Sequence, residues 1–306
     1  MDPLFEQYAL ILVGCLVAGG LAVVVLTRAE NPVAASIQKT YFSWLIMIPI
    51  AFAVLLAGRL PTVAGFTMLS IAGFYEFARV TEVATNRWQT WSVLLLICVT
   101  FGCIALPQPD QPGWMGLFQA MPAWAAGILL AIPVLQDRAS GELRKVALSI
   151  VGFLYIGWMF AHIGWLANSE YAAGYLLYFL FAVGVTDVSA FTFGSVFGRR
   201  ALRPNISPNK TVEGAIGAFL VAMVLPWLLR FSFPESVGPL QLILFGLIVG
   251  IGGQLGDLAI SMVKRDRNVK DMGDAIPGHG GVLDRIDSLI FTSPVLFHTL
   301  KFFDCL

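Results

Sequence analysis

The sequence predicts an all-α, polytopic integral membrane protein with about nine or ten transmembrane helices. Of the 306 residues, 58% are hydrophobic and only 12% are charged, and the mean hydropathy is +0.79. This composition is typical of a chain that crosses lipid several times rather than of a soluble domain. The formal net charge of zero argues against an electrostatically driven nucleic-acid-binding protein.

Uncharged runs that are long enough, or nearly so, to cross about 30 Å of hydrocarbon recur along the chain, and each predicts one helix. In order, the runs are Tyr8–Leu26, Tyr41–Gly58, Leu60–Tyr75, Trp91–Leu106, Trp114–Leu135, Val146–Ser169, Tyr171–Thr186, Gly214–Leu229 and Ser236–Gly256. The tail, Ser288–Leu306, is a tenth and weaker candidate. No basic residue precedes the first run, so we expect a retained helix and not a cleaved signal peptide.

The placement of Lys and Arg predicts the orientation of these helices. The connections after the first, third, fifth, seventh and ninth runs hold 16 of the 19 basic residues, and the opposite side holds Arg59, Arg230 and Lys301. Cytoplasmic loops carry the positive excess, so we expect ten crossings with both termini outside. We expect the site to face the cytoplasm, with the protein in a bacterial inner (plasma) membrane.

One charged segment, residues 257–287, organises the chain. It holds 11 of the 38 charged residues and lies between two apolar runs. We therefore divide the chain into N-terminal transmembrane helices, residues 1–170, and a C-terminal catalytic region, residues 171–306. The glycines of residues 246–256 predict close helix packing and not a dinucleotide loop, because no strand precedes them. The four cysteines form no CxxC pattern, so we expect neither disulfides nor zinc.

Three acidic residues lie in apolar surroundings, where an Asp costs about 2.5 to 3.5 kcal/mol at the centre of a membrane helix. Glu76 comes three residues before Arg79, and this spacing favours a structural ion pair over a catalytic role. Asp187 ends an aromatic-rich run, and it either contacts substrate or caps a cavity. Asp257 begins the charged segment.

The sequence SPNKT predicts a phosphate-binding turn. Lys210 lies between Ser207 and Thr211, directly before a helix whose first turn includes Glu213. Backbone amides at a helix N-terminus, beside a Lys and hydroxyl groups, are typical of phosphate sites. There is no GxxxxGK[ST] sequence, so this is not a P-loop.

The charged segment supplies the carboxylates for a metal site. Asp257, Ser261 and Lys264 share one face if the helix continues. Asp284 and Asp287 lie one helical turn apart, after a flexible GHGG turn at residues 278–281. Together with Asp257, these two carboxylates form a plausible oxygen cage for Mg²⁺ and substrate phosphates.

Metal-binding carboxylates, Lys and Arg clusters and a phosphate turn at one membrane surface predict phosphoryl or nucleotidyl transfer to a lipid. His279, between two glycines, is equally a functional group or a structural residue. A transporter is the alternative of another class, with Glu76, Asp187 and Asp257 along its pathway. It predicts acids spread through the membrane depth, whereas here they gather with Lys and Arg. A third alternative is a membrane scaffold protein without catalytic activity, in which the motif residues serve only folding.

Residues Ser261–Asp287 read S-x-V-K-R-x4-K-D-x-G-x2-I-P-x-H-G-G-x2-D-R-x-D. This resembles the signature of phosphatidate cytidylyltransferases (CDP-diacylglycerol synthases). Residues Asp187–Arg199 are similar to the family's D-x-x-A-Y-x-x-G block, and Ser207–Gly214 are similar to its S-P-x-K-T-x-E-G block. The resemblance covers roughly the last 120 residues, and the first 170 show no such motif.

The resemblance implies that CTP and phosphatidate give CDP-diacylglycerol and pyrophosphate, with no strong general base. It implies Mg²⁺, with K⁺ as an optional second ion, held by Asp257 and Asp284 and supported by Asp287. The catalytic residues it implies are Asp257, Lys264, Arg265, Lys270, Asp271, His279, Asp284 and Asp287. The substrate-binding residues it implies are Asp187, Ser207, Lys210, Thr211, Glu213, Ser261 and Arg285.

Four positions depart from the pattern expected of that family. Phe191 replaces a usual Tyr, Ser195 and Asn209 replace common basic residues, and Ile260 stands where Glu often follows the GDL block. These departures leave open a paralogous cytidylyltransferase that acts on another lipid phosphate. A homodimer is also left open.

Overall fold

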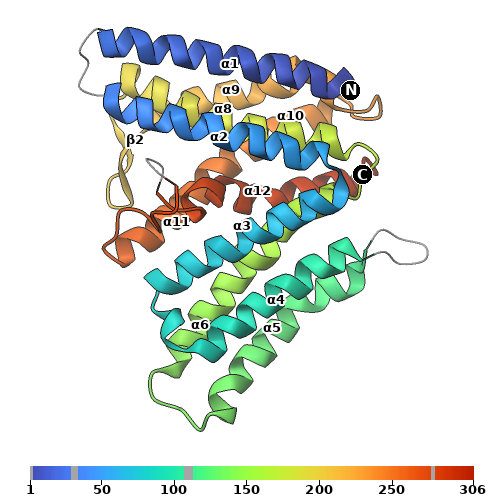
Figure 1. Cartoon of the computed structure of the whole chain (residues 1–306), viewed down its shortest axis with the longest axis vertical. Helices are drawn as coiled ribbons and strands as arrows, with labels where there is room; N and C mark the ends of the chain where they lie inside the picture. Colours follow the sequence, from blue (N-terminus) through green and yellow to red (C-terminus); the bar gives the residue numbers. More distant parts are fainter. Residues whose placement is uncertain (1–2, 29–33, 107–112, 277–279) are drawn as a thin grey trace.

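The computed structural model describes residues 3–28, 34–106, 113–276 and 280–306, and it confirms a polytopic helical protein (Figure 1). The α-helices are α1 Pro3–Arg28, α2 Ala34–Leu56, α3 Arg59–Val80, α4 Arg87–Ala105, α5 Met115–Leu135, α6 Glu142–Gly152, α7 Phe160–Leu166, α8 Ala172–Phe197, α9 Val212–Leu228, α10 Pro239–Leu247, α11 Gly253–Asp266 and α12 Leu283–Phe302. The 3-10 helices are η1 Val83–Thr85 and η3 Arg230–Ser232, and the π-helices are η2 Phe153–Met159 and η4 Ile248–Gly252.

Seven helical segments of the described residues are long and apolar enough to cross a membrane. They are Pro3–Val25, Gln38–Leu56, Arg87–Ala105, Met115–Leu135, Glu142–Leu166, Ala172–Phe197 and Pro239–Asp266. The other three predicted runs also lie in helices, namely α3, α9 and α12. Every predicted run is therefore helical, while a count of nine or ten crossings stays a prediction.

Two of the long helices contain π-helical turns. η2 joins α6 to α7, and η4 joins α10 to α11. Both pack against α12. The glycines near η4 allow this close approach, as predicted: a Cβ atom on Gly252 would lie 2.7 Å from the Thr292 side chain. Short π-helical turns frequently mark functional sites, and these two lie beside the helix that carries Asp284 and Asp287.

A short β-hairpin in this otherwise helical chain corrects the predicted SPNKT turn. Strand β1, Ala201–Arg203, pairs antiparallel with β2, Ser207–Thr211, with Arg203 opposite Ser207. Pro208 is compatible with β2 because a two-stranded ribbon leaves an outer edge where no N–H group has to donate. The predicted helix start after SPNKT is confirmed, since Thr211 Oγ1 accepts a hydrogen bond from the Gly214 amide at 3.1 Å and caps α9.

The helices place the hairpin and α11 on the same side of the molecule. In Figure 1 both termini lie on the right, and the hairpin and α11 lie on the left. α12 packs against α3, α7 and α11. Helices from residues 1–170 therefore contact the helix that carries the end of the signature segment.

Candidate active site

An ion pair joins the hairpin to α11. Lys210, on β2, contacts Asp257 through its ammonium group, and Asp257 Oδ1 accepts a hydrogen bond from Ser261 Oγ at 3.1 Å. The Arg265 guanidinium donates to the Ile206 carbonyl at 3.1 Å. The predicted shared face of Asp257 and Ser261 is confirmed, and the two sequence blocks meet at this point.

A second ion pair joins α11 to α12. Lys264 Nζ lies 2.8 Å from Asp284 Oδ1, and the two side chains are only 12% and 2% exposed. Asp284 Oδ2 accepts hydrogen bonds from the amides of Met272 at 2.8 Å and Gly281 at 3.0 Å. Asp284, in the first turn of α12, therefore binds Met272 and Gly281 of the segment between α11 and α12. Both carboxylate oxygens of Asp284 accept hydrogen bonds.

Three carboxylates from three helices lie close enough to these pairs for their charges to influence one another. Asp187 on α8 and Asp287 on α12 both feel the negative charge of Asp257 on α11. Asp287 is buried and accepts a hydrogen bond from the Ser288 amide at 2.7 Å. Repulsion among these negative charges makes the site attractive to cations. The positive charge of Arg285 already offsets part of the negative charge of Asp187.

The donor set fits Mg²⁺ in part. No three His, Cys, Asp or Glu side chains of the described residues are grouped so that they could hold a metal ion. Asp257 and Asp287 offer carboxylate oxygens, the ligand type that Mg²⁺ prefers, and their repulsion would be relieved by a cation. Asp257 would have to release Lys210, and Asp284 would have to release Lys264, before either could act as a ligand.

Other predicted residues lie around this centre. Glu213 Oε2 accepts hydrogen bonds from the amides of Arg199 at 3.0 Å and Arg200 at 3.2 Å, so its carboxylate fixes the base of the hairpin. These hydrogen bonds, of which that from the Arg199 amide has the largest effect, lower the pKa of Glu213 to about 2. Lys270 and Asp271 are exposed where the loop begins. His279 lies outside the described residues.

The predicted partner of Glu76 is wrong. Its side chain faces the core and Arg79 is exposed, so the expected pair does not form. Instead Glu76 Oε1 accepts a hydrogen bond from the Val282 amide at 2.9 Å, and Oε2 accepts one from the Leu283 amide at 2.8 Å. The positive end of the α12 dipole stabilises this carboxylate.

Tyr155 is a second residue that sequence reasoning missed. It lies in η2, and its hydroxyl donates to the Gly256 carbonyl at 3.4 Å. The charges of Asp287 and Asp257 both act on it. A Tyr in an aromatic-rich apolar run carries no sequence signal, and its place in the site follows from the packing of η2 on α12.

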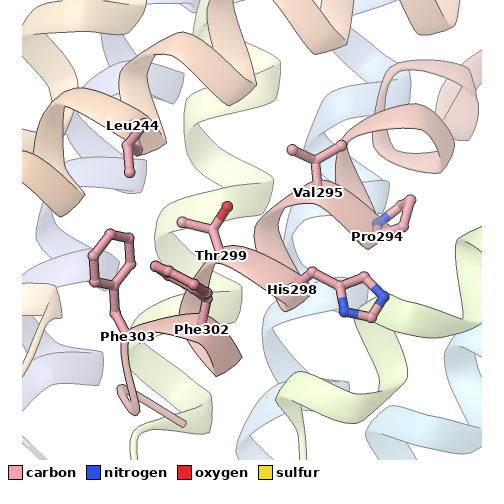
Figure 2. Close-up of a pocket in the computed structure, with 7 residues that line it drawn as sticks. All are labelled: Leu244, Pro294, Val295, His298, Thr299, Phe302 and Phe303. Atoms are coloured by element: carbon pink, nitrogen blue, oxygen red, sulfur yellow. The ribbon is translucent and has the colours of Figure 1, made fainter.

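An open, mostly apolar pocket in the described part of the chain lies away from these charges. It has a volume of about 600 Å³ and is lined by Leu244, Pro294, Val295, His298, Thr299, Phe302 and Phe303 (Figure 2). His298 follows Asp284 on α12 by about four turns, or about 20 Å along the helix axis. The geometry therefore places the candidate active site at the other end of α12.

Comparisons with known proteins agree with this geometry. The sequence model of the cytidylyltransferase family matches residues 38–303. The uncharacterized protein YnbB of Escherichia coli (strain K12) is 32% identical over 262 residues, which cover 83% of this chain and 84% of the relative. The phosphatidate cytidylyltransferase of Bacillus subtilis (strain 168) is 38% identical over 253 residues, or 81% and 91% of the two chains.

A further relative is the phosphatidate cytidylyltransferase of Staphylococcus aureus (strain COL), which is 36% identical over 204 residues, or 66% of this chain and 76% of the relative. The family match begins at residue 38, so the likeness extends well into the region in which the sequence showed no motif. The match covers most of the chain, including the hairpin, α11 and α12. The chain therefore belongs to the cytidylyltransferase family.

Proposed function

We propose that this protein is a CTP-dependent phosphatidate cytidylyltransferase, which makes CDP-diacylglycerol and pyrophosphate. The observation that carries the proposal is the pair of Lys–Asp contacts that bring β2, α11 and α12 together, Lys210 with Asp257 and Lys264 with Asp284. They gather cations and carboxylates from separate sequence blocks at one end of a membrane-spanning bundle. Relatives that are named for this activity share the chain over most of its length.

In the proposed reaction an oxygen of the lipid phosphate attacks the α-phosphorus of CTP. A P–O bond forms there, the bond between the α-phosphorus and the bridging oxygen to the β-phosphate breaks, and pyrophosphate leaves. A phosphate monoester is largely ionised at pH 7, so the nucleophile needs no strong base. This agrees with a site rich in Lys and Asp, whose task is to offset charge and align the phosphates.

The two lysines are suited to exchange partners when substrate binds. Lys210 is 30% exposed and Lys264 is 12% exposed, and each is held by a carboxylate. The phosphates of CTP would compete with Asp257 and Asp284 for these ammonium groups. Release of the carboxylates would make them available to a cation, so anion and cation binding would favour each other.

We propose Mg²⁺ as the cofactor, with K⁺ as an optional second ion. Asp257 and Asp287 would hold Mg²⁺, with Asp284 joining once Lys264 turns to a phosphate. The bound ion would supply positive charge for the triphosphate and the leaving pyrophosphate. Support comes from the repulsion among Asp187, Asp257 and Asp287.

Three of the four departures from the family pattern are exposed and bear on the choice of lipid acceptor. Ile260 is buried and so has no direct contact with a substrate. Phe191 and Ser195 are exposed on α8, and Asn209 is exposed on β2, where a lipid headgroup can reach them. A change at these three positions is therefore expected to alter the choice of lipid phosphate.

The test is an assay of purified protein in detergent with labelled CTP, Mg²⁺ and a panel of lipid phosphates. We expect labelled CDP-diacylglycerol and pyrophosphate with phosphatidate. A stronger signal with another lipid phosphate would favour the paralogous activity. If no lipid phosphate yields a CDP-lipid or pyrophosphate, the enzyme proposal fails, and the result favours a transporter or a scaffold protein.

A further inference from the structure

Glu76, in the N-terminal half of the chain, reaches the end of the signature segment. Its carboxylate accepts the backbone hydrogen bonds of Val282 and Leu283 at 2.9 and 2.8 Å. Glu76 is 8% exposed, so both bonds are shielded from water. A buried carboxylate without donors would be strongly unfavourable, and these two amides meet that need.

The glycines of the signature loop fit around this carboxylate. A Cβ atom on Gly273 would lie 2.5 Å from Glu76 Oε1, and the three atoms nearest to it all belong to Glu76. A Cβ atom on Gly281 would also meet the Glu76 carboxylate. Gly273 has no unusual backbone angle, so the absence of a side chain there is explained by the presence of Glu76.

Glu76 and Asp284 together occupy the N-terminus of α12. Glu76 takes the amides of Val282 and Leu283, and Asp284 takes that of Gly281. A helix N-terminus is an attractive place for a phosphate, but here the protein's own acids fill it. In the proposed function, Lys210 and Lys264 would instead bind substrate phosphates through their ammonium groups.

We propose that Glu76 is a positioning residue for the active site. By holding the loop and the first turn of α12, it fixes Asp284 and Asp287 relative to Lys264 and Asp257. The kinetic part of this inference rests on the proposed function, and the structural part does not. This role would also explain why α3, one of the N-terminal helices, contacts the segment that contains the proposed catalytic residues.

The kinetic test compares Glu76→Gln and Glu76→Asp with a control, Glu82→Gln, which removes an exposed carboxylate just beyond the same helix. We expect Glu76→Gln to lower kcat by about 100-fold through small displacements of reacting groups, with the KM for CTP changed much less. Glu76→Asp keeps the charge and should recover part of kcat. An unchanged kcat, or equal losses in kcat and CTP binding, would overturn the proposal.

The structural test uses hydrogen exchange of the full-length protein and needs no activity. In Glu76→Gln, the amides of Val282 and Leu283 should exchange faster, while those of α4 and α5 keep their rates. Unchanged exchange at residues 281–283 would contradict the proposed hold of Glu76 on the start of α12, even if the enzyme is active. Faster exchange in Glu76→Gln, with a wild-type protein that converts no lipid phosphate, would support the hold of Glu76 on α12 and reject the proposed function.

A double-mutant cycle guards against a general loss of folding. Gly273→Ala should raise exchange in residues 272–283 when Glu76 is present, because the new methyl group meets its carboxylate. In the background of Glu76→Ala the same substitution should have little further effect, since the obstructing atoms are gone. Additive effects of the two changes would show that Gly273 and Glu76 are not coupled, and the proposal would fail.

Discussion

Lys210 in β2 and Asp257 in α11 form an ion pair across 47 positions of the chain. Both side chains are partly exposed, at 30% and 27%. A salt bridge of this kind contributes little to stability, because solvent screens it. Its position between two sequence blocks, within reach of a phosphate, points to a role in binding substrate.

Lys210→Met should therefore reduce kcat/KM for CTP by about 100-fold, as the loss of one preorganised positive charge does, while thermal stability stays close to that of the wild type. Lys210→Arg keeps the charge but not the compact ammonium group, so it should be intermediate. The measurement is steady-state kinetics with varied CTP. Lys301→Met, exposed at the other end of α12, is the control, and near-normal kinetics of Lys210→Met would exclude Lys210 from the site.

The buried pair of Lys264 and Asp284 should behave differently. Asp284→Asn leaves Lys264 as an unpaired buried charge, which costs about 3 kcal/mol of unfolding free energy. The double variant Lys264→Met with Asp284→Asn should recover most of that stability, because no charge remains buried, yet neither variant should turn over substrate.

Unfolding in denaturing detergent, measured in parallel with turnover, separates the two effects. Asp266→Asn serves as a control, since Asp266 pairs with Arg267 at 3.2 Å but its side chain is 65% exposed, and it should cost less than about 1 kcal/mol. Turnover in the double variant would mean that Asp284 supports only the fold.

The pH response of the hairpin follows from Glu213. Its pKa is lowered from 4.5 to about 2 by the amides of Arg199 and Arg200 and by its own amide. A depressed pKa means that the stabilisation is complete above pH 4.5 and is lost as the pH falls toward 2. The stability difference between wild type and Glu213→Gln should be constant above pH 4.5 and shrink below it.

A direct measurement is the carboxyl carbon resonance of Glu213 in micelles, which should titrate near pH 2. A midpoint for Glu213 near the ordinary value of 4.5 would argue that the two backbone hydrogen bonds do not persist in solution.

The orientation in the membrane is tested by cysteine labelling. In a variant without the four native cysteines, Asp266→Cys should react with an impermeant maleimide only from the cytoplasmic side. Glu235→Cys, in the connection between α9 and α10, should react only from outside. The reverse pattern would invert the predicted orientation, and labelling of both positions from one side would contradict the predicted crossing between them.

Sequence patterns were sufficient for the local features of the fold and site. Long uncharged runs predict helices because lipid leaves the backbone no other partner than itself, and each predicted run is helical. The spacing of Asp257 and Ser261 predicts their contact because it depends only on helix geometry, and the structure confirms that contact.

Features that depend on distant backbone groups escaped prediction. Glu76 binds amides more than 200 positions away, and an amide has no sequence identity to recognise. Arg79 was the wrong partner because a three-residue spacing gives proximity but not burial, and the two side chains face different surroundings. Pro208 suggested a turn, although the pairing of β1 with β2 makes it part of a strand.

Gly256 sets the distance between the helices that carry Asp257 and Asp287. A Cβ atom on Gly256 would lie 3.0 Å from Ser288 Cα and 3.1 Å from the Asp287 carbonyl carbon. These are backbone atoms of α12, which no side-chain rotation can move away. Gly256→Ala should therefore push α11 from α12, lower the melting temperature and abolish most turnover.

The matched control is Gly127→Ala in α5, where no atom lies within 4 Å of the added Cβ atom. This substitution should be neutral or stabilising, because Ala is a better helix former than Gly by about 1 kcal/mol. Both variants add one methyl group to a helical glycine, so any difference between them reflects the contact with α12. Full turnover in Gly256→Ala would show that Asp257 and Asp287 can act without the close approach of these helices, and the proposed shared cation site would then be untenable.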